Sequence, residues 1–141
     1  MRILGIDFGQ RRIGVAVSDS LGITAQPLAV IERGGQVSDI KMVAELIQKH
    51  AVELVVMGLP LALSGKRGPE AQRAAAFAES LKRETAIPVV WVDERFTTAQ
   101  GSRALTEAGE SHRRQKSRID QVAAQLILQS YLDSKDAKNS G

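Results

Sequence analysis

Short apolar runs alternate with amphipathic segments along most of this chain, a pattern that predicts an α/β fold. Apolar runs bounded by Gly, Pro and polar residues are typical of buried strands. They occur at residues 2–8, 12–18, 23–31, 52–57 and 88–92. Apolar residues that recur every three or four positions predict helices. Such segments cover residues 37–50, 70–84, 97–108 and 119–132.

The order of these segments predicts the topology of the sheet. Three strands precede the first helix, which predicts an antiparallel meander. The later strands alternate with helices, which predicts parallel pairing with helices on both faces. Pro27 cannot donate a hydrogen bond to a neighbouring strand, so the third strand should lie at an edge. We therefore expect a mixed five-stranded sheet, antiparallel in its first three strands and parallel in the remainder.

The length and composition favour one domain. The chain has 141 residues, of which 43% are hydrophobic, enough for a single core. We expect one domain over residues 1–133 and a flexible polar tail over residues 134–141. There are no cysteines, which excludes disulfides and cysteine-based zinc sites. No apolar stretch reaches the roughly 18 to 20 residues that a membrane span needs. An apolar strand begins at residue 2, so we expect no secretory leader and a cytoplasmic protein without membrane partners.

Three acidic residues lie at the ends of predicted elements. Asp7 lies within the first apolar run, Glu94 follows the fifth directly after Asp93, and Asp120 opens the last helix. An unpaired carboxylate among apolar groups costs several kcal/mol, and three together would repel one another unless a cation joined them. Hard oxygen ligands suit Mg²⁺ or Mn²⁺. The chemistry typical of such a site is metal-assisted phosphodiester cleavage, with Asp7, Glu94 and Asp120 as catalytic metal ligands.

Basic residues gather in predicted loops near the strand ends and in one short stretch without acids, which begins in the polar loop expected at residues 110–117. The net charge is +3, and the sequence pI of about 9.5 favours an anionic partner. Phosphate contacts give affinity without sequence specificity. Aromatic residues are only 4%, which favours structured RNA or branched DNA over stacked single strands. The candidate nucleic-acid contacts are Arg11, Arg12, Lys66, Arg67, Arg95, Arg113, Arg114, Lys116 and Arg118. A solvated surface is the alternative for each of them.

Four sequence blocks together resemble the YqgF/RuvX family. They are residues 7–19 (DFGQRRIGVAVSD), 58–61 (GLPL), 93–98 (DERFTT) and 116–124 (KSRIDQVAA). The resemblance runs from about residue 2 to residue 133. It implies a ribonuclease H-like fold and a nuclease that matures the 5′ end of 16S rRNA. Resolution of four-way DNA (Holliday) junctions is the alternative activity. The family pattern also favours Glu94 over Asp93 as the ligand.

Other interpretations of the same residues stay open. Asp7 could be a structural carboxylate, Asp120 a favourable charge near a helix N-terminus, and Asp93 a partner of the ligands. Related resolvases carry a further carboxylate one turn after Asp120, where this chain has Ala123. A nucleic-acid-binding assembly factor without catalysis is therefore a second hypothesis. A third is an ATP-binding half-domain similar to the actin-like ATPases. For a nuclease we expect endonucleolytic cleavage, with a homodimer left open.

Overall fold

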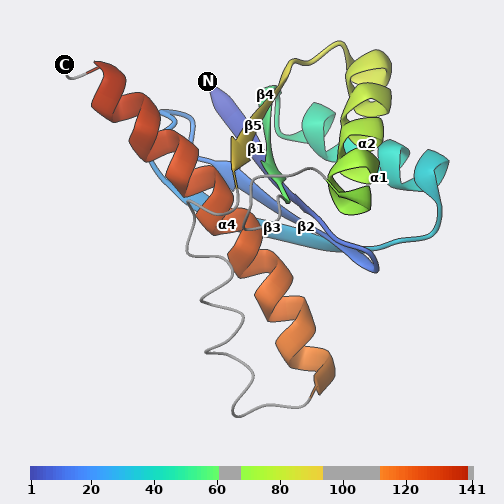
Figure 1. The fold of residues 1–141 in the computed structure, drawn as a ribbon. Helices are drawn as coiled ribbons and strands as arrows, with labels where there is room; N and C mark the ends of the chain where they lie inside the picture. The colour runs from blue at the N-terminus through green and yellow to red at the C-terminus, as the bar shows by residue number, and fades with distance from the viewer. Residues whose placement is uncertain (61–67, 94–111, 140–141) are drawn as a thin grey trace.

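Five strands form one mixed sheet in the computed structural model of this chain (Figure 1). The structure describes residues 1–60, 68–93 and 112–139, with side chains for all of these except 112–120 and 136–139. The strands are β1 (Arg2–Phe8), β2 (Arg12–Ser18), β3 (Ala25–Glu32), β4 (Val52–Leu59) and β5 (Val89–Asp93). Their order in the sheet is β3-β2-β1-β4-β5.

The strand pairing confirms the predicted topology. β1 pairs with β2, and β2 with β3, in antiparallel fashion. β1 with β4 and β4 with β5 are parallel pairs. β3 lies at one edge, as Pro27 predicts, and its register with β2 shifts between Val15 and Ala16, where Ala16 faces Pro27. β1 is therefore the central strand, flanked by one antiparallel and one parallel neighbour.

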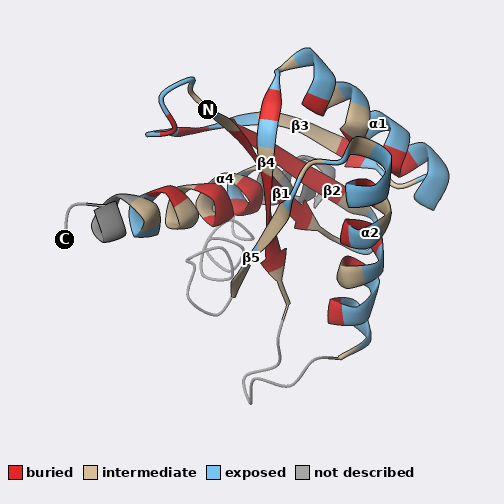
Figure 2. Ribbon diagram, turned by 90° about the horizontal axis from the view of Figure 1, so that it is seen from above, coloured by how far each residue is buried: buried red, intermediate tan, exposed pale blue. Residues whose placement is uncertain are grey.

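Helices cover both faces of this sheet, again as predicted. The helices are α1 (Gln36–Lys49), α2 (Pro69–Thr85) and α4 (His112–Asn139). α1 and α2 pack on one face through side chains such as Val43 and Phe77. α4 packs on the other through Ala124, Ile127 and Leu128. Figure 2 shows the buried positions on the strands and on the helix sides that face them. The expected helix at residues 97–108 lies outside the described residues.

The last helix is longer at both ends than the sequence predicts. It was expected over residues 119–132, after a polar loop, but α4 begins at His112 and ends at Asn139. The expectation of a loop at residues 110–117 is thus wrong from residue 112 onward. Apolar periodicity starts only at Ile119, whereas Arg, Gln and Lys are good helix formers without it. The expected tail at residues 134–141 begins inside this helix, and its flexibility stays a prediction. None of the described helices is long and apolar enough to cross a membrane.

Two glutamines of α4 hold the helix against the edge strand. The Gln125 side chain donates a hydrogen bond to the Ala25 carbonyl (3.1 Å). The Gln129 side chain accepts one from the Ala25 N–H (2.9 Å). Gln129 also donates to the Ile23 carbonyl (3.1 Å). Backbone groups that an edge strand leaves unpaired are satisfied by these side chains.

A glycine allows α4 to approach the central strand closely. A Cβ atom on Gly5 would lie 2.6 Å from the Leu128 Cβ and 3.1 Å from the Ala124 carbonyl oxygen. The first distance is far below van der Waals contact, and a Cβ cannot swing away as the end of a long side chain can. Gly5 therefore sets the separation between β1 and α4.

Substitution of this glycine tests the packing. We expect Gly5→Ala to force α4 away from β1 and to lower the free energy of unfolding by about 1–3 kcal/mol, the range for overpacked cores. The measurement is urea denaturation followed by circular dichroism. Gly68→Ala is the matched control, because a Cβ there meets no atom within 4 Å. Equal stability of the two variants would contradict the close packing.

Candidate functional site

Asp7 is a buried acid at the carboxyl end of the central strand. Its side chain is 3% exposed, and its backbone faces Gly14 of β2. Side chains alternate along a strand, so Asp7 follows Gly5 onto the face that α4 covers. Phe8, the next residue, packs on the opposite face, with its ring centroid 4.7 Å from that of Phe77. The sequence thus places an acid where the sheet ends and α4 passes over it.

A cavity of about 180 Å³ opens beside Asp7. It lies at the carboxyl ends of the parallel strands, where open α/β sheets bind their ligands. The lining residues come from β1 and the turn after it, from the end of β4 and from the first turns of α2. They are Asp7, Phe8, Gly9, Gln10, Pro60, Glu70 and Arg73.

Three polar residues of this cavity were not predicted from the sequence. Glu70 and Arg73 resemble the solvent-facing residues of any amphipathic helix, and Gln10 resembles an ordinary turn residue. The Gln10 side chain donates to the Glu70 carboxylate at 3.3 Å, across 60 positions of the chain. Only the folded chain brings them beside Asp7.

The turn after Asp7 requires its glycine. The Gly9 N–H donates to the Arg12 carbonyl at 3.0 Å, and a Cβ on Gly9 would lie 2.7 Å from that oxygen. Gly9 thus has a structural role in the β1–β2 hairpin. The hairpin also directs Asp7 and the exposed Arg11 to the same end of the sheet.

A buried ion pair supports this hairpin from the other side. Asp39 of α1 is fully buried and accepts hydrogen bonds from the Arg33 Nε (3.3 Å) and the Gly34 N–H (3.0 Å). The Arg33 guanidinium lies 4.5 Å from the centre of the Phe8 ring and donates to the Gly9 carbonyl at 3.4 Å. Arg33 thereby links α1 to the two residues that follow Asp7.

Asp19, at the end of the first sequence block, closes a turn. Its carboxylate accepts hydrogen bonds from the N–H groups of Ile23 (2.7 Å) and Thr24 (3.3 Å). The Ile23 hydrogen bond is the main reason that the pKa of Asp19 lies below its ordinary value. Asp19 follows β2 and takes no part in the cavity beside Asp7.

Asp93 is the last residue of β5, so it lies at the same end of the sheet as Asp7, where the parallel strands have their carboxyl ends. It faces Leu59 of β4, and Met57 of β4 faces Ile6 of β1. Adjacent strands are about 4.8 Å apart, so only the width of β4 separates the two strand ends. Val92 packs in the cluster under α4. Alternation therefore places Asp93 on the face opposite to Asp7.

The other predicted site residues are described only in part. Glu94, Arg95, Lys66 and Arg67 lie outside the described residues. The backbone of α4 includes Asp120, Arg113, Arg114, Lys116 and Arg118, without described side chains. Asp120 thus occurs one turn before Ala124, on a helix that crosses β1. Arg12 is held by Glu32 at 3.0 Å. Within the described part of the chain, no three acidic or histidine side chains form a group that could hold a metal.

Two solved structures share this fold. The structure of Thermus thermophilus RuvC with a Holliday junction substrate is similar, with a TM-score of 0.59 and 17% identity, over 96% of this chain and 95% of that one. The Fowlpox virus resolvase with its junction DNA gives a TM-score of 0.52 and 16% identity, over 95% and 98% of the two chains. At these identities the likeness shows the fold alone, which is ribonuclease H-like as the sequence predicted.

Sequence comparison adds the family. Residues 1–134 match the family described as RuvX, Holliday junction resolvase. A relative from Moorella thermoacetica, named "Putative pre-16S rRNA nuclease", is 48% identical over 94% of this chain and 95% of its own length. A relative from Caldanaerobacter subterraneus with the same name is 45% identical over 99% and 100%. The chain belongs to the RuvX family, as its four sequence blocks predicted.

The two arginine–carboxylate pairs near the hairpin should contribute differently to the free energy of unfolding. We expect Arg33→Met to lower the free energy of unfolding by about 3 kcal/mol, because it leaves the buried Asp39 charge without its cation. Arg12→Met should cost less than about 1 kcal/mol, because the side chain of its partner Glu32 is 72% exposed. Thermal or urea denaturation of the two variants measures the difference. Equal costs would show that Asp39 does not depend on Arg33.

Proposed function

We propose that this chain is a metal-dependent endonuclease that hydrolyses phosphodiester bonds during 5′-end maturation of pre-16S rRNA. One observation carries the proposal: the buried Asp7 carboxylate borders a cavity where the central strand of a ribonuclease H-like sheet ends. The names of relatives more than 40% identical point to the same substrate. An rRNA precursor as substrate implies a cytoplasmic site of action.

The donor chemistry at Asp7 fits a divalent cation. A carboxylate at the rim of a polar cavity is a hard oxygen ligand, and Mg²⁺ or Mn²⁺ prefers such ligands. Glu94 and Asp120 are the proposed further ligands. The orientation of Asp93 toward the opposite face supports the choice of Glu94. The position of Asp120, one turn before the Ala124 that packs on β1, supports the third ligand. A bound cation would activate water and stabilise the leaving oxygen.

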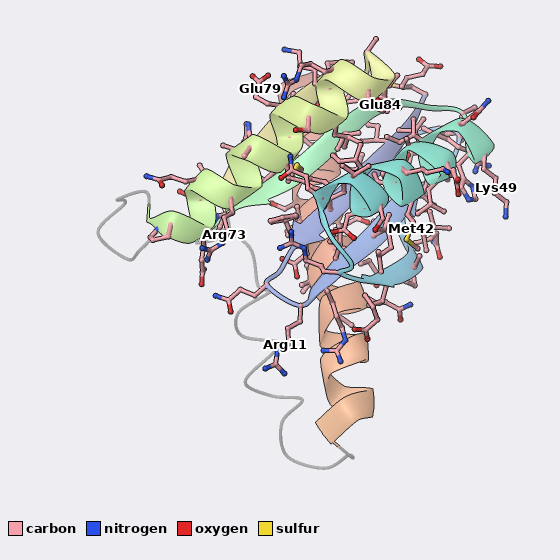
Figure 3. All side chains as sticks on the ribbon, turned by 90° about the vertical axis from the view of Figure 1, so that its right-hand side faces the viewer. Arg11, Met42, Lys49, Arg73, Glu79 and Glu84 are labelled. Atoms are coloured by element: carbon pink, nitrogen blue, oxygen red, sulfur yellow. The ribbon has the colours of Figure 1, made fainter. Side chains whose placement is uncertain are left out.

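The basic residues predicted from the sequence would hold the substrate. Arg11 is exposed at the tip of the β1–β2 hairpin, at the end of the sheet where Asp7 lies (Figure 3). Arg113, Arg114, Lys116 and Arg118 occur in the first two turns of α4, which precede Asp120. Lys66, Arg67 and Arg95 are proposed contacts from the segments after β4 and β5. Such phosphate contacts position a backbone without reading its sequence.

Holliday junction resolution is the second candidate activity. The family description favours it. A junction presents two equivalent strands, so this activity implies a two-fold symmetric dimer.

The residue one turn after Asp120 on α4 is Ala123, which is buried and has no carboxylate. We therefore propose that Asp7, Glu94 and Asp120 alone supply the carboxylate ligands.

A substitution of Asp7 tests the proposed chemistry. We expect the wild-type protein with Mg²⁺ or Mn²⁺ to cleave a 16S precursor RNA bearing its 5′ leader. Asp7→Asn should reduce the rate at least about 100-fold, the upper range for losing even an outer partner of a metal site. Asp19→Asn is the matched control, because that acid lies in a turn outside the cavity. Gel analysis of end-labelled RNA measures the rate and separates internal cuts from end trimming.

The same assay distinguishes the other functions. Faster cleavage of a four-way DNA junction than of the RNA would favour the resolvase. Tight RNA binding without cleavage under either metal would support the assembly factor. Full activity of the Asp7→Asn protein would refute the site assignment itself.

A further inference from the structure

Arg73 has a guanidinium group that no other described residue engages. Six arginines have described side chains, namely Arg2, Arg11, Arg12, Arg33, Arg73 and Arg83. Three of them bind a side chain: Arg12 pairs with Glu32, Arg33 with Asp39, and Arg83 donates to Ser80. Arg73 makes no hydrogen bond or ion pair with the described part of the chain, although it lines the cavity beside Asp7.

A potential partner is nearby, but it is otherwise engaged. Glu70 lies three residues before Arg73 on α2, a spacing at which opposite charges often pair. Its carboxylate instead accepts a hydrogen bond from Gln10 of the hairpin. This contact joins α2 to the β1–β2 turn, and among the described residues no ion pair forms between Glu70 and Arg73.

Arg73 lies at the same end of the molecule as Arg11. Figure 3 shows Arg73 near the start of α2 and Arg11 at the hairpin tip, both at the end of the molecule where β1 ends. Glu79, Glu84 and Lys49 lie away from this end in the same view. Arg11 and Arg73 are both exposed and both unpaired within the described residues. Two unpaired arginines thus lie at this end of the molecule, and Arg73 lines the cavity beside Asp7.

We propose that Arg73 contacts a backbone phosphate of the nucleic acid, in a subsite formed with Gln10 on the α2 side of the Asp7 cavity. The inference rests on the proposed function, because it assumes a nucleic-acid substrate at Asp7. It adds a contact from α2, a helix outside the four sequence blocks that resemble the family. Guanidinium groups bind phosphate oxygens well because they present several donors in one plane. Arg73 would hold the strand and Asp7 would serve the reacting phosphate.

The test measures binding without catalysis. Affinities of the wild-type, Arg73→Gln and Arg83→Gln proteins are measured by fluorescence anisotropy in EDTA, over a series of salt concentrations. One arm uses 16S precursor RNA and the other a four-way DNA junction. Arg83→Gln is the matched control, because it removes the same charge ten positions later on α2, away from the cavity.

Of these two substitutions, only Arg73→Gln should change the salt dependence of binding. Loss of one phosphate contact should weaken binding several-fold and reduce the slope of log K against log salt by about 0.7–0.9. Arg83→Gln should keep the wild-type slope. Arg73→Lys should also keep most of it, because it preserves the charge.

The two proposals fail in different ways. If Arg73→Gln and Arg83→Gln bind alike while the wild type binds tightly, the Arg73 subsite is wrong and the nuclease proposal stands. If the wild type binds neither polymer, the proposed function fails and the subsite fails with it. The arm with the larger effect of Arg73→Gln identifies the polymer that reaches this subsite.

Discussion

The contact between Gly5 and α4 fixes the distance between two elements that carry proposed metal ligands. β1 ends at Phe8, the residue after Asp7, and α4 includes Asp120 two turns before Leu128. A Cβ on Gly5 would lie 2.6 Å from the Leu128 Cβ. The helix can therefore pack this close to β1 only over a glycine. Gln125 and Gln129, one turn apart, bind the same helix to the edge strand β3. The proposed site thus depends on the close packing at Gly5, two residues before Asp7.

The opposite face of the sheet supports the same strand end by different means. There Asp39 holds Arg33, and Arg33 contacts the Phe8 ring and the Gly9 carbonyl. A buried charge is tolerated only where it is paired and hydrogen-bonded, so this network belongs to one arrangement of the hairpin. The hairpin then binds α2 through Gln10 and Glu70. Contacts from α1, α2 and α4 therefore converge on the residues around Asp7.

The sequence predicted the strands and the topology well, because these follow from local patterns. The order of the segments predicted which strands pair in parallel and which in antiparallel fashion, and Pro27 predicted the edge strand. The start of α4 was missed, because residues 112–118 form a helix without apolar periodicity. Glu70 and Arg73 were missed because no local signal separates them from other surface residues of an amphipathic helix. The roles of Glu94 and Asp120 stay predictions, since the structure describes neither side chain.

The central claim is that Asp7 binds a divalent cation, and Mn²⁺ affinity tests it most directly. Calorimetric titration would compare the wild-type, Asp7→Asn and Asp19→Asn proteins, with circular dichroism to confirm that each is folded. We expect the wild type and Asp19→Asn to bind Mn²⁺ equally. The Asp7→Asn protein should bind at least about tenfold more weakly. Equal affinity of all three folded proteins would contradict the account and leave Asp7 as a structural carboxylate.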